Sequence, residues 1–105
     1  MNSQELANKI KEILDDKKGI DIEIIYVGEK TTLSDYFVLV TGTSSTHVKA
    51  LAGEVEAKLS EEGIVPLHFE RKMSDSWIAL DYENVILHVF SEEARKLYNL
   101  EKLWK

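Results

Sequence analysis

Hydrophobic positions in the first half of the chain switch between helical and strand-like spacing. A helix is predicted after Asn2, because apolar residues recur every three or four positions until Gly19. Residues 21–27 begin with alternating acidic and β-branched side chains, which predicts a strand. Residues 35–41 are apolar at both parities, which indicates a strand covered on both faces. A second helix is predicted from Ser45 onward, with an apolar stripe formed by Val48, Leu51, Ala52, Val55 and Leu59.

The second half of the chain predicts three more strands and a short helix. Residues 64–69 have the pattern of a short strand that Pro66 places at an edge or an end, and a polar loop over residues 71–76 follows. Strands over 77–82 and 85–90 are separated by two residues only, which predicts an antiparallel hairpin. Beyond them, a serine followed by two acidic residues predicts a capped last helix, and the apolar tail is expected to pack on the domain.

These elements predict an α/β (α+β) fold with the order α-β-β-α-β-β-β-α. The strand–helix–strand step around residues 45–62 implies one right-handed parallel crossover, whereas the later hairpin is antiparallel. The sheet is therefore expected to be mixed, with about five strands and with helices packed against it. Because no linker, repeat or low-complexity tract interrupts the chain, we expect a single domain over residues 1–105.

Composition and charge narrow the function mainly by exclusion. The absence of cysteine excludes disulfides and thiolate chemistry. Thirteen basic and 19 acidic side chains give a net charge of −6, which disfavours nonspecific nucleic-acid binding and suits a basic protein partner, although it also serves solubility. No apolar run approaches the roughly 20 residues that span a bilayer, and the N-terminus lacks a secretory signal. A cytoplasmic protein is expected.

The three histidines are the obvious candidates for metal ligands or general bases. His47, His68 and His88 lie 21 and 20 residues apart, without the close pairs of common zinc motifs, so no metal site is predicted. His88 alternates with apolar residues on one face of its strand. That position is more typical of a partly buried, hydrogen-bonded imidazole than of a catalytic base.

The turn Gly42-Thr43-Ser44-Ser45 follows a strand and opens a helix, a setting in which main-chain N–H groups can bind an anion. However, the chain has no phosphate-binding or dinucleotide-binding glycine motif and no nucleophile elbow. Helix capping explains the hydroxyls more simply. A nucleotide-binding or nucleotidyltransferase-type enzyme that uses this turn and Asp81 is the alternative hypothesis, and no cofactor is predicted.

Aromatic residues gather toward the C-terminus. Five of the nine lie within 28 residues, namely Trp77, Tyr82, Phe90, Tyr98 and Trp104. Strand parity places Trp77 and Asp81 on one face and Ile78 on the other. Exposed Trp and Tyr side chains are common anchors of protein interfaces, and internal packing is the alternative for all five.

Five segments taken together resemble the ribosomal silencing factor family, the Iojap-related proteins. They are Asp35-Tyr36-Phe37-Val38, Thr41-Gly42-Thr43-Ser44-Ser45-x-His47-Val48, Trp77-Ile78-x-Leu80-Asp81-Tyr82, Val85-Ile86-Leu87-His88-Val89-Phe90 and Tyr98-x-Leu100-Glu101-x-Leu103-Trp104. The resemblance runs from Ile22 to Trp104. The chain departs from the family pattern at Thr46, where a basic residue is common, and at Glu70-Arg71, where Glu-Gly is typical.

The resemblance implies a factor that is not an enzyme and that represses translation when nutrients are scarce. Such a factor binds the large ribosomal subunit through the protein numbered fourteenth in the standard naming, and it blocks joining of the small subunit. The resemblance also implies a fold similar to that of nucleotidyltransferases, and self-association off the ribosome.

The partner-binding residues that the resemblance implies are Trp77, Ile78, Asp81, His88, Tyr98 and Leu100. Trp77 and Ile78 are expected to form a desolvated anchor, and Asp81 a charge-matched contact. His88 and Tyr98 are expected to form hydrogen bonds at the rim.

Overall fold

Helices and strands follow one another in the order α1, β1, β2, α2, β3, β4, β5, α3 and α4. The computed structural model describes residues 2–67, 71–74 and 76–104. The bounds are α1 Ser3–Asp16, β1 Ile20–Tyr26, β2 Tyr36–Gly42, α2 Ser45–Ser60, β3 Arg71–Ser74, β4 Trp77–Asp81, β5 Val85–Ser91, α3 Glu92–Tyr98 and α4 Leu100–Trp104. No helix in the described part of the chain has the length and hydrophobicity needed to span a bilayer.

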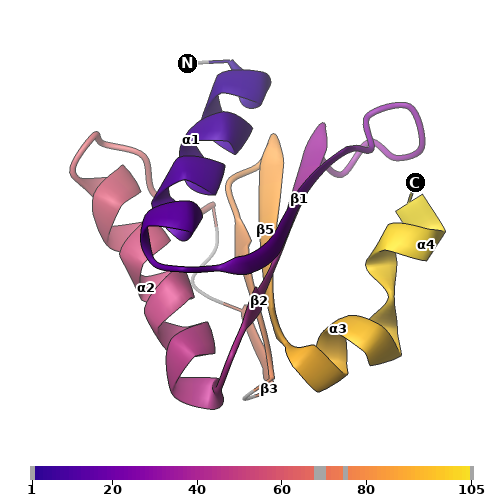
Figure 1. Cartoon of the computed structure of the whole chain (residues 1–105). Helices are drawn as coiled ribbons and strands as arrows, with labels where there is room; N and C mark the ends of the chain where they lie inside the picture. The colour runs from indigo at the N-terminus through magenta and orange to yellow at the C-terminus, as the bar shows by residue number, and fades with distance from the viewer. Residues whose placement is uncertain (1, 68–70, 75, 105) are drawn as a thin grey trace.

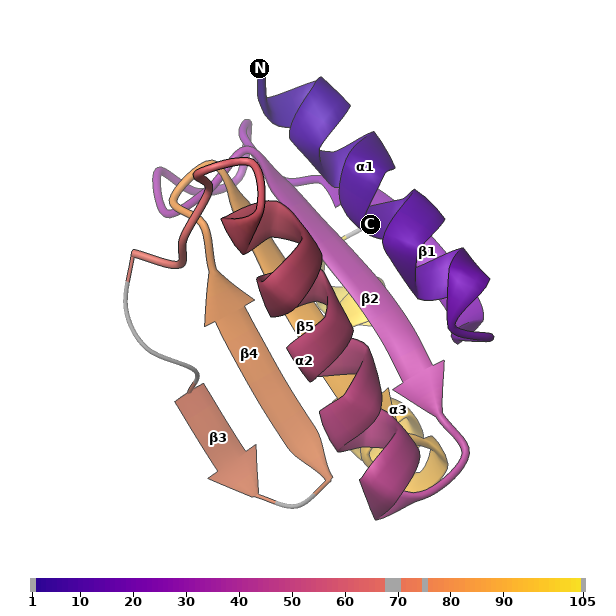
Figure 2. The ribbon, with the colours of Figure 1, turned by 90° about the vertical axis from the view of Figure 1, so that its left-hand side faces the viewer.

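The strands form one mixed sheet in the order β1-β2-β5-β4-β3, with β1 and β3 at its two edges (Figure 2). The central pair, β2 and β5, is parallel, and every other pair is antiparallel. The parallel register places Tyr36 opposite Val85 and Gly42 opposite Ser91. The mixed α+β class expected from the sequence is therefore confirmed, as is the antiparallel pairing of β4 with β5.

The sheet lies between two helical layers, with α1 and α2 on one face and α3 and α4 on the other (Figure 1). Because successive side chains of a strand point to opposite faces, β4 contributes to two separate cores. Ile78 and Leu80 are fully buried in the core beneath α1 and α2. Trp77 packs on the smaller core beneath α3 and α4, which consists of Ile25, Val27, Phe37, Leu39, Phe90 and Ala94.

Side-chain caps begin three of the helices at the predicted places. The Asn2 Oδ1 accepts a hydrogen bond from the main-chain N–H of Glu5 at 2.8 Å, at the start of α1. Ser44 caps α2 and Ser91 caps α3 in the same way, each through its hydroxyl at 3.1 Å. Each cap satisfies a main-chain donor that the helix itself leaves unpaired, a contribution of about 1 kcal/mol.

The segment between α2 and β4 corrects the sequence-based prediction. Residues 64–67 are not a strand, and residues 68–69 of the predicted strand lie outside the described residues, as does Glu70. Instead, β3 lies where a polar loop was predicted, with Arg71 opposite Ala79 of β4. An edge strand is held by main-chain pairing and needs no apolar pattern, so a polar sequence can form one. Pro66, which has no N–H to donate, lies in the irregular part.

The C-terminal segment forms two short helices rather than one helix and a tail. Asn99 separates α3 from α4 and adopts a left-handed conformation with φ 44°. Asn tolerates this conformation better than most residues because its short side chain can bond locally. The break turns α4 back along the sheet (Figure 1).

Candidate functional site

An aromatic cluster covers the sheet face beneath α3 and α4. It consists of Phe37 from β2, Trp77 from β4, His88 and Phe90 from β5, and Tyr98 at the end of α3. Trp77 lies at its centre, with ring centroids 5.8 Å from His88, 5.2 Å from Phe90 and 4.5 Å from Tyr98. Phe37 meets His88 edge-on at 5.0 Å. These separations are those of favourable aromatic pairs, so the rings hold one another in place.

The side chain of His88 holds the indole of Trp77 in place. The indole Nε1–H of Trp77 donates a hydrogen bond to Nδ1 of His88 at 3.1 Å. His88 is only 8% exposed, and burial lowers the pKa of its imidazole to about 4. The ring is therefore neutral at physiological pH, and its role in this structure is to orient Trp77. The expectation that His88 lies at an interface rim is corrected by its burial.

The outer side of this region carries exposed apolar side chains. Trp77 is partly exposed, Tyr98 is 44% exposed, and Leu97 and Leu103 stand exposed on α3 and α4. Asp81, partly exposed at the end of β4, accepts a hydrogen bond at Oδ1 from the main-chain N–H of Glu83. We call Trp77, Asp81, Leu97, Tyr98 and Leu103 the C-terminal surface.

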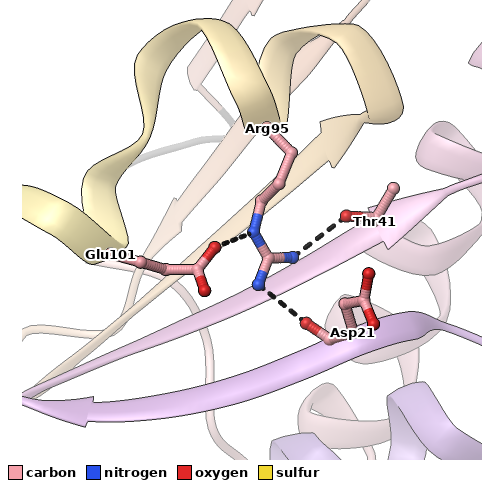
Figure 3. Close-up of polar contacts among 4 residues, drawn as sticks. All are labelled: Asp21, Thr41, Arg95 and Glu101. Carbon is pink, nitrogen blue, oxygen red and sulfur yellow. Dashed lines mark hydrogen bonds and ion pairs between the residues drawn. The ribbon is translucent and has the colours of Figure 1, made fainter.

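The guanidinium of Arg95 fastens the helices of this surface to the sheet (Figure 3). Its Nε donates to Glu101 Oε1 of α4 at 2.6 Å, and its Nη1 donates to the hydroxyl of Thr41 on β2 at 3.0 Å. Its Nη2 donates to the carbonyl oxygen of Asp21 on β1 at 2.8 Å. A planar fork of donors can serve three acceptors in different directions at once. Sequence reasoning missed this residue.

The carbonyl of Asp21 is available to Arg95 because β1 is irregular there. Pairing with β2 shifts register between Ile20 and Glu23, and Asp21 has φ 50°. Such a bulge breaks the ladder locally and turns one peptide group away from the neighbouring strand. The irregular stretch of β1 therefore supplies an acceptor for Arg95, and this hydrogen bond helps to hold α3 on the sheet.

The structure brings together most, but not all, of the predicted partner-binding residues. Trp77, Asp81 and Tyr98 contribute to the C-terminal surface, and Leu100 packs partly buried on the core beneath α4. Ile78 lies on the opposite face, fully buried under the helices α1 and α2. The expectation that Ile78 anchors a partner is therefore corrected, because its side chain cannot reach the surface that Trp77 occupies.

Burial also divides the other aromatic residues singled out in the sequence. Phe90 is buried in the smaller core, and Tyr82 is buried in the larger one, where burial and nearby Glu56 raise its pKa to about 12. These two are packing residues. The side chain of Trp104 lies outside the described part of the chain.

Thr43 and Ser44 of the Gly42–Ser45 turn are engaged within the fold. Ser44 caps α2, and the main-chain N–H of Thr43 donates to Nδ1 of His47 at 2.9 Å. The Nε2 of His47 lies 3.0 Å from the carbonyl oxygen of Lys17, and joins the start of α2 to the end of α1. Capping and helix attachment account for this turn. His68 lies outside the described residues, and among those described no three His, Asp or Glu side chains gather closely enough to hold a metal ion.

Sequence comparisons relate the whole chain to one family. A family profile described as "Ribosomal silencing factor during starvation" matches residues 1–105. The chain is 35% identical over 99 residues to a ribosomal silencing factor of Haemophilus influenzae, covering 94% of this chain and 97% of the relative. It is 33% identical over 104 residues to that of Bacillus subtilis, covering 99% of this chain and 88% of the relative. A mouse protein named "Mitochondrial assembly of ribosomal large subunit protein 1" is 31% identical over 97 residues, which cover 88% of this chain and 42% of that protein.

Solved structures agree with this relationship. A crystal structure of a protein from Chromobacterium violaceum is 34% identical and superposes with a TM-score of 0.93, covering 99% of this chain and 87% of that one. A second, from Bacillus halodurans, is 33% identical with a TM-score of 0.83 and covers 96% of this chain and 94% of that one.

Proposed function

Given that the chain belongs to the ribosomal silencing factor family, we propose that it binds the large ribosomal subunit and represses translation by obstructing the small subunit. The observation that carries the proposal is the partly exposed Trp77, held over a layer of buried aromatic rings. This arrangement is a means of attachment that involves no chemical reaction.

Trp77 has the properties of an interface anchor. Its indole is fixed by a hydrogen bond from below and by ring contacts on its sides, so little conformational freedom is left to lose on binding. Tryptophan and tyrosine are the residues that most often dominate binding energy, in the desolvated centre of an interface. Trp77 and Tyr98, whose rings are in contact, are the proposed centre.

Charge favours a basic protein as the direct partner. The domain carries a net charge of −6, and Asp81 lies on the same sheet face as Trp77, at the other end of β4. An acidic surface repels the phosphate backbone of ribosomal RNA, whereas it attracts and orients a basic protein. We propose the fourteenth-numbered protein of the large subunit as this partner, with Asp81 facing one of its basic side chains.

The inhibition itself requires only volume. The Cα trace measures 31 × 31 × 22 Å along its principal axes, and a body of that size on the joining surface occupies space that the small subunit needs. The proposed location is the cytoplasm. We further propose that a second copy of the chain pairs with the exposed apolar surface when no ribosome is bound, a state that concentration-dependent sedimentation measures.

Co-sedimentation with purified large ribosomal subunits tests the proposal. Wild-type protein is expected to pellet with the subunits, and Trp77→Ala to bind at least about 30-fold more weakly, the scale of a lost hot spot of about 2 kcal/mol. Tyr26→Ala is the matched control, because Tyr26 is an exposed aromatic residue on β1, on the sheet face opposite Trp77. Equal binding by folded Trp77→Ala and Tyr26→Ala would refute the assigned anchor.

The nucleotidyltransferase-type alternative makes a different prediction. A nucleoside triphosphate with magnesium would raise the melting temperature of a nucleotide-binding domain. We expect no such rise, because the turn proposed for that role is engaged in capping α2 and in holding α1. We propose a fold similar to that of nucleotidyltransferases but without their activity.

A further inference from the structure

Helix α4 is too short to be stable without contacts to the rest of the fold. It has five residues, Leu100–Trp104, and an isolated helix of that length does not persist in water. Leu100 is partly buried and packs on the smaller core, whereas Leu103 is exposed. Lys102 donates its main-chain N–H to the carbonyl oxygen of Asn99 at 3.1 Å, a bond within the segment itself. The position of α4 therefore depends on side-chain contacts with the domain.

One of these contacts is the ion pair of Glu101 with Arg95 (Figure 3). Arg95 Nε and Glu101 Oε1 are 2.6 Å apart, and the Glu101 carboxylate is partly exposed. The guanidinium also donates to Thr41 and to Asp21 on the sheet, and these two bonds hold α3 whether or not Glu101 is in place. Arg95 is thus fixed to the sheet, and α4 is attached to it through the carboxylate of Glu101.

Asn99 lies at the junction of the two helices and can act as a hinge. It is exposed and adopts a left-handed conformation with φ 44° and ψ 51°. A residue with a Cβ atom keeps this conformation only while its surroundings impose it. Rotation at this residue moves α4 and leaves α3 in place, because Ala94 of α3 is buried in the smaller core and Ser91 caps the helix.

We infer that α4 opens and closes about Asn99, and that the ion pair of Arg95 with Glu101 is the latch that keeps it closed. In the closed state, which is the one described above, Leu100 packs on the smaller core. In the open state Leu100 leaves this core while α3 stays on the sheet. Because the Glu101 carboxylate is partly exposed, salt screens the latch and favours the open state.

The hinge acts on the surface that we propose for attachment, and this consequence rests on the proposed function. Closing places Leu103 on the C-terminal surface, where Trp77 and Tyr98 remain in contact in both states. A partner that binds the complete surface favours the closed state, and its apparent affinity falls in proportion to the closed fraction. Binding of the large subunit is therefore expected to close α4.

Hydrogen exchange of the free chain, followed by nuclear magnetic resonance, tests the latch. Glu101→Ala is expected to raise the exchange rate of the Leu103 amide about 3- to 10-fold, the scale of one partly exposed charged hydrogen bond. Lys102→Ala is the matched control, because Lys102 is the next residue of α4 and lies exposed, and it is expected to keep the wild-type rate. The Lys96 amide of α3 is expected to be unchanged in both variants. Equal rates in the two variants, or equal acceleration of α3 and α4, would overturn the inference.

Salt provides a second readout of the latch. Raising the salt concentration from about 0.05 M to about 0.5 M is expected to speed exchange of the Leu103 amide about twofold in wild type, relative to the Lys96 amide. In Glu101→Ala, which has no ion pair to screen, the same change is expected to have no effect. A salt response of equal size in both proteins would contradict the role of the ion pair.

Substitutions at Asn99 test the hinge without touching the latch. Asn99→Val is expected to open α4, because a β-branched side chain resists a positive φ, whereas Asn99→Gly is expected to leave α4 closed. If the Leu103 amide exchanges equally fast in the two variants, the hinge is assigned to the wrong residue.

Purified large ribosomal subunits separate the inference from the proposed function. When they are added to the wild-type chain, exchange in α4, followed by mass spectrometry, is expected to slow. Absence of binding contradicts the proposed function and the expected closure, while the measurements on the free chain still decide whether the hinge exists. Binding that leaves exchange in α4 unchanged contradicts the coupling between the hinge and attachment.

Discussion

Replacing Arg95 with Ala is expected to release α3 and α4 from the sheet and to lower the free energy of unfolding by about 2–3 kcal/mol. The side chain is only 10% exposed and donates to three acceptors, on α4, β2 and β1. Each lost hydrogen bond contributes about 1 kcal/mol, and the buried hydroxyl of Thr41 is left without this donor. The ion pair with Glu101 adds little, because that carboxylate is 30% exposed and water screens it.

Thermal and urea unfolding measure the loss. In a domain of 105 residues, a destabilisation of this size corresponds to a fall in the melting temperature of about 10 °C. Hydrogen exchange adds the location, since amides of α4 are expected to lose protection before those of β2 and β5. The melting temperature of Arg95→Lys is expected to lie between those of wild type and Arg95→Ala. An ammonium group keeps the charge but cannot donate to three acceptors that lie in different directions.

Lys96→Ala is the matched control, since Lys96 is the next residue of the same helix and lies exposed. Its free energy of unfolding is expected to stay within about 0.5 kcal/mol of wild type. If Arg95→Ala also stays within that margin, the reasoning is refuted and α4 is held by its apolar contacts alone. Large-subunit binding by Arg95→Ala is expected to weaken as well, because Tyr98 and Leu103 would lose their fixed positions.

Three further perturbations act on stability. A Cβ atom on Gly42 would lie 2.9 Å from both Cγ2 and the main-chain nitrogen of Val48, so Gly42→Ala is expected to cost about 1–3 kcal/mol in urea unfolding. Gly53→Ala, where an added Cβ meets nothing within 4 Å in helix α2, is expected to stabilise by about 0.5–1 kcal/mol, and equal effects of the two would contradict the packing argument. Burial lowers the pKa of His88 from 6.5 to about 4, so the unfolded chain takes up this proton first as pH falls. The contribution of this pKa difference to the free energy of unfolding, about 3 kcal/mol in total, is fully present above about pH 6.5 and is lost as the pH falls toward 4. The substitution His88→Phe should flatten this part of the dependence of stability on pH.

Local signals in the sequence predicted most of the secondary structure. Asn2, Ser44 and Ser91 each bond the main chain three residues further on, so the helix starts depend on neighbours along the chain. The tight turn at Glu83 and Asn84, which lies between Tyr82 and Val85, similarly determines the register of the β4–β5 hairpin. The β3 strand was missed because its pairing is made by the main chain and leaves no trace in the side-chain pattern.

The candidate site was only partly predictable, because burial depends on contacts between distant segments. Strand parity placed Trp77 and Ile78 on opposite faces, but the sequence did not show that the Ile78 face is fully covered by α1 and α2. Arg95 bonds residues 6, 54 and 74 positions away, a separation at which no local motif exists. The resemblance to a family supplied the candidate partner-binding positions, and only the three-dimensional packing showed which of them are exposed and which are buried.

The measurement that tests the central claim most directly is joining of purified small and large ribosomal subunits, followed by light scattering. Wild-type protein preincubated with the large subunit is expected to suppress the rise in scattering that accompanies joining, and Tyr26→Ala to suppress it equally. A folded Trp77→Ala variant at the same concentration should leave joining close to its uninhibited level. Full suppression by Trp77→Ala, or undisturbed joining in the presence of wild-type protein, would contradict the account.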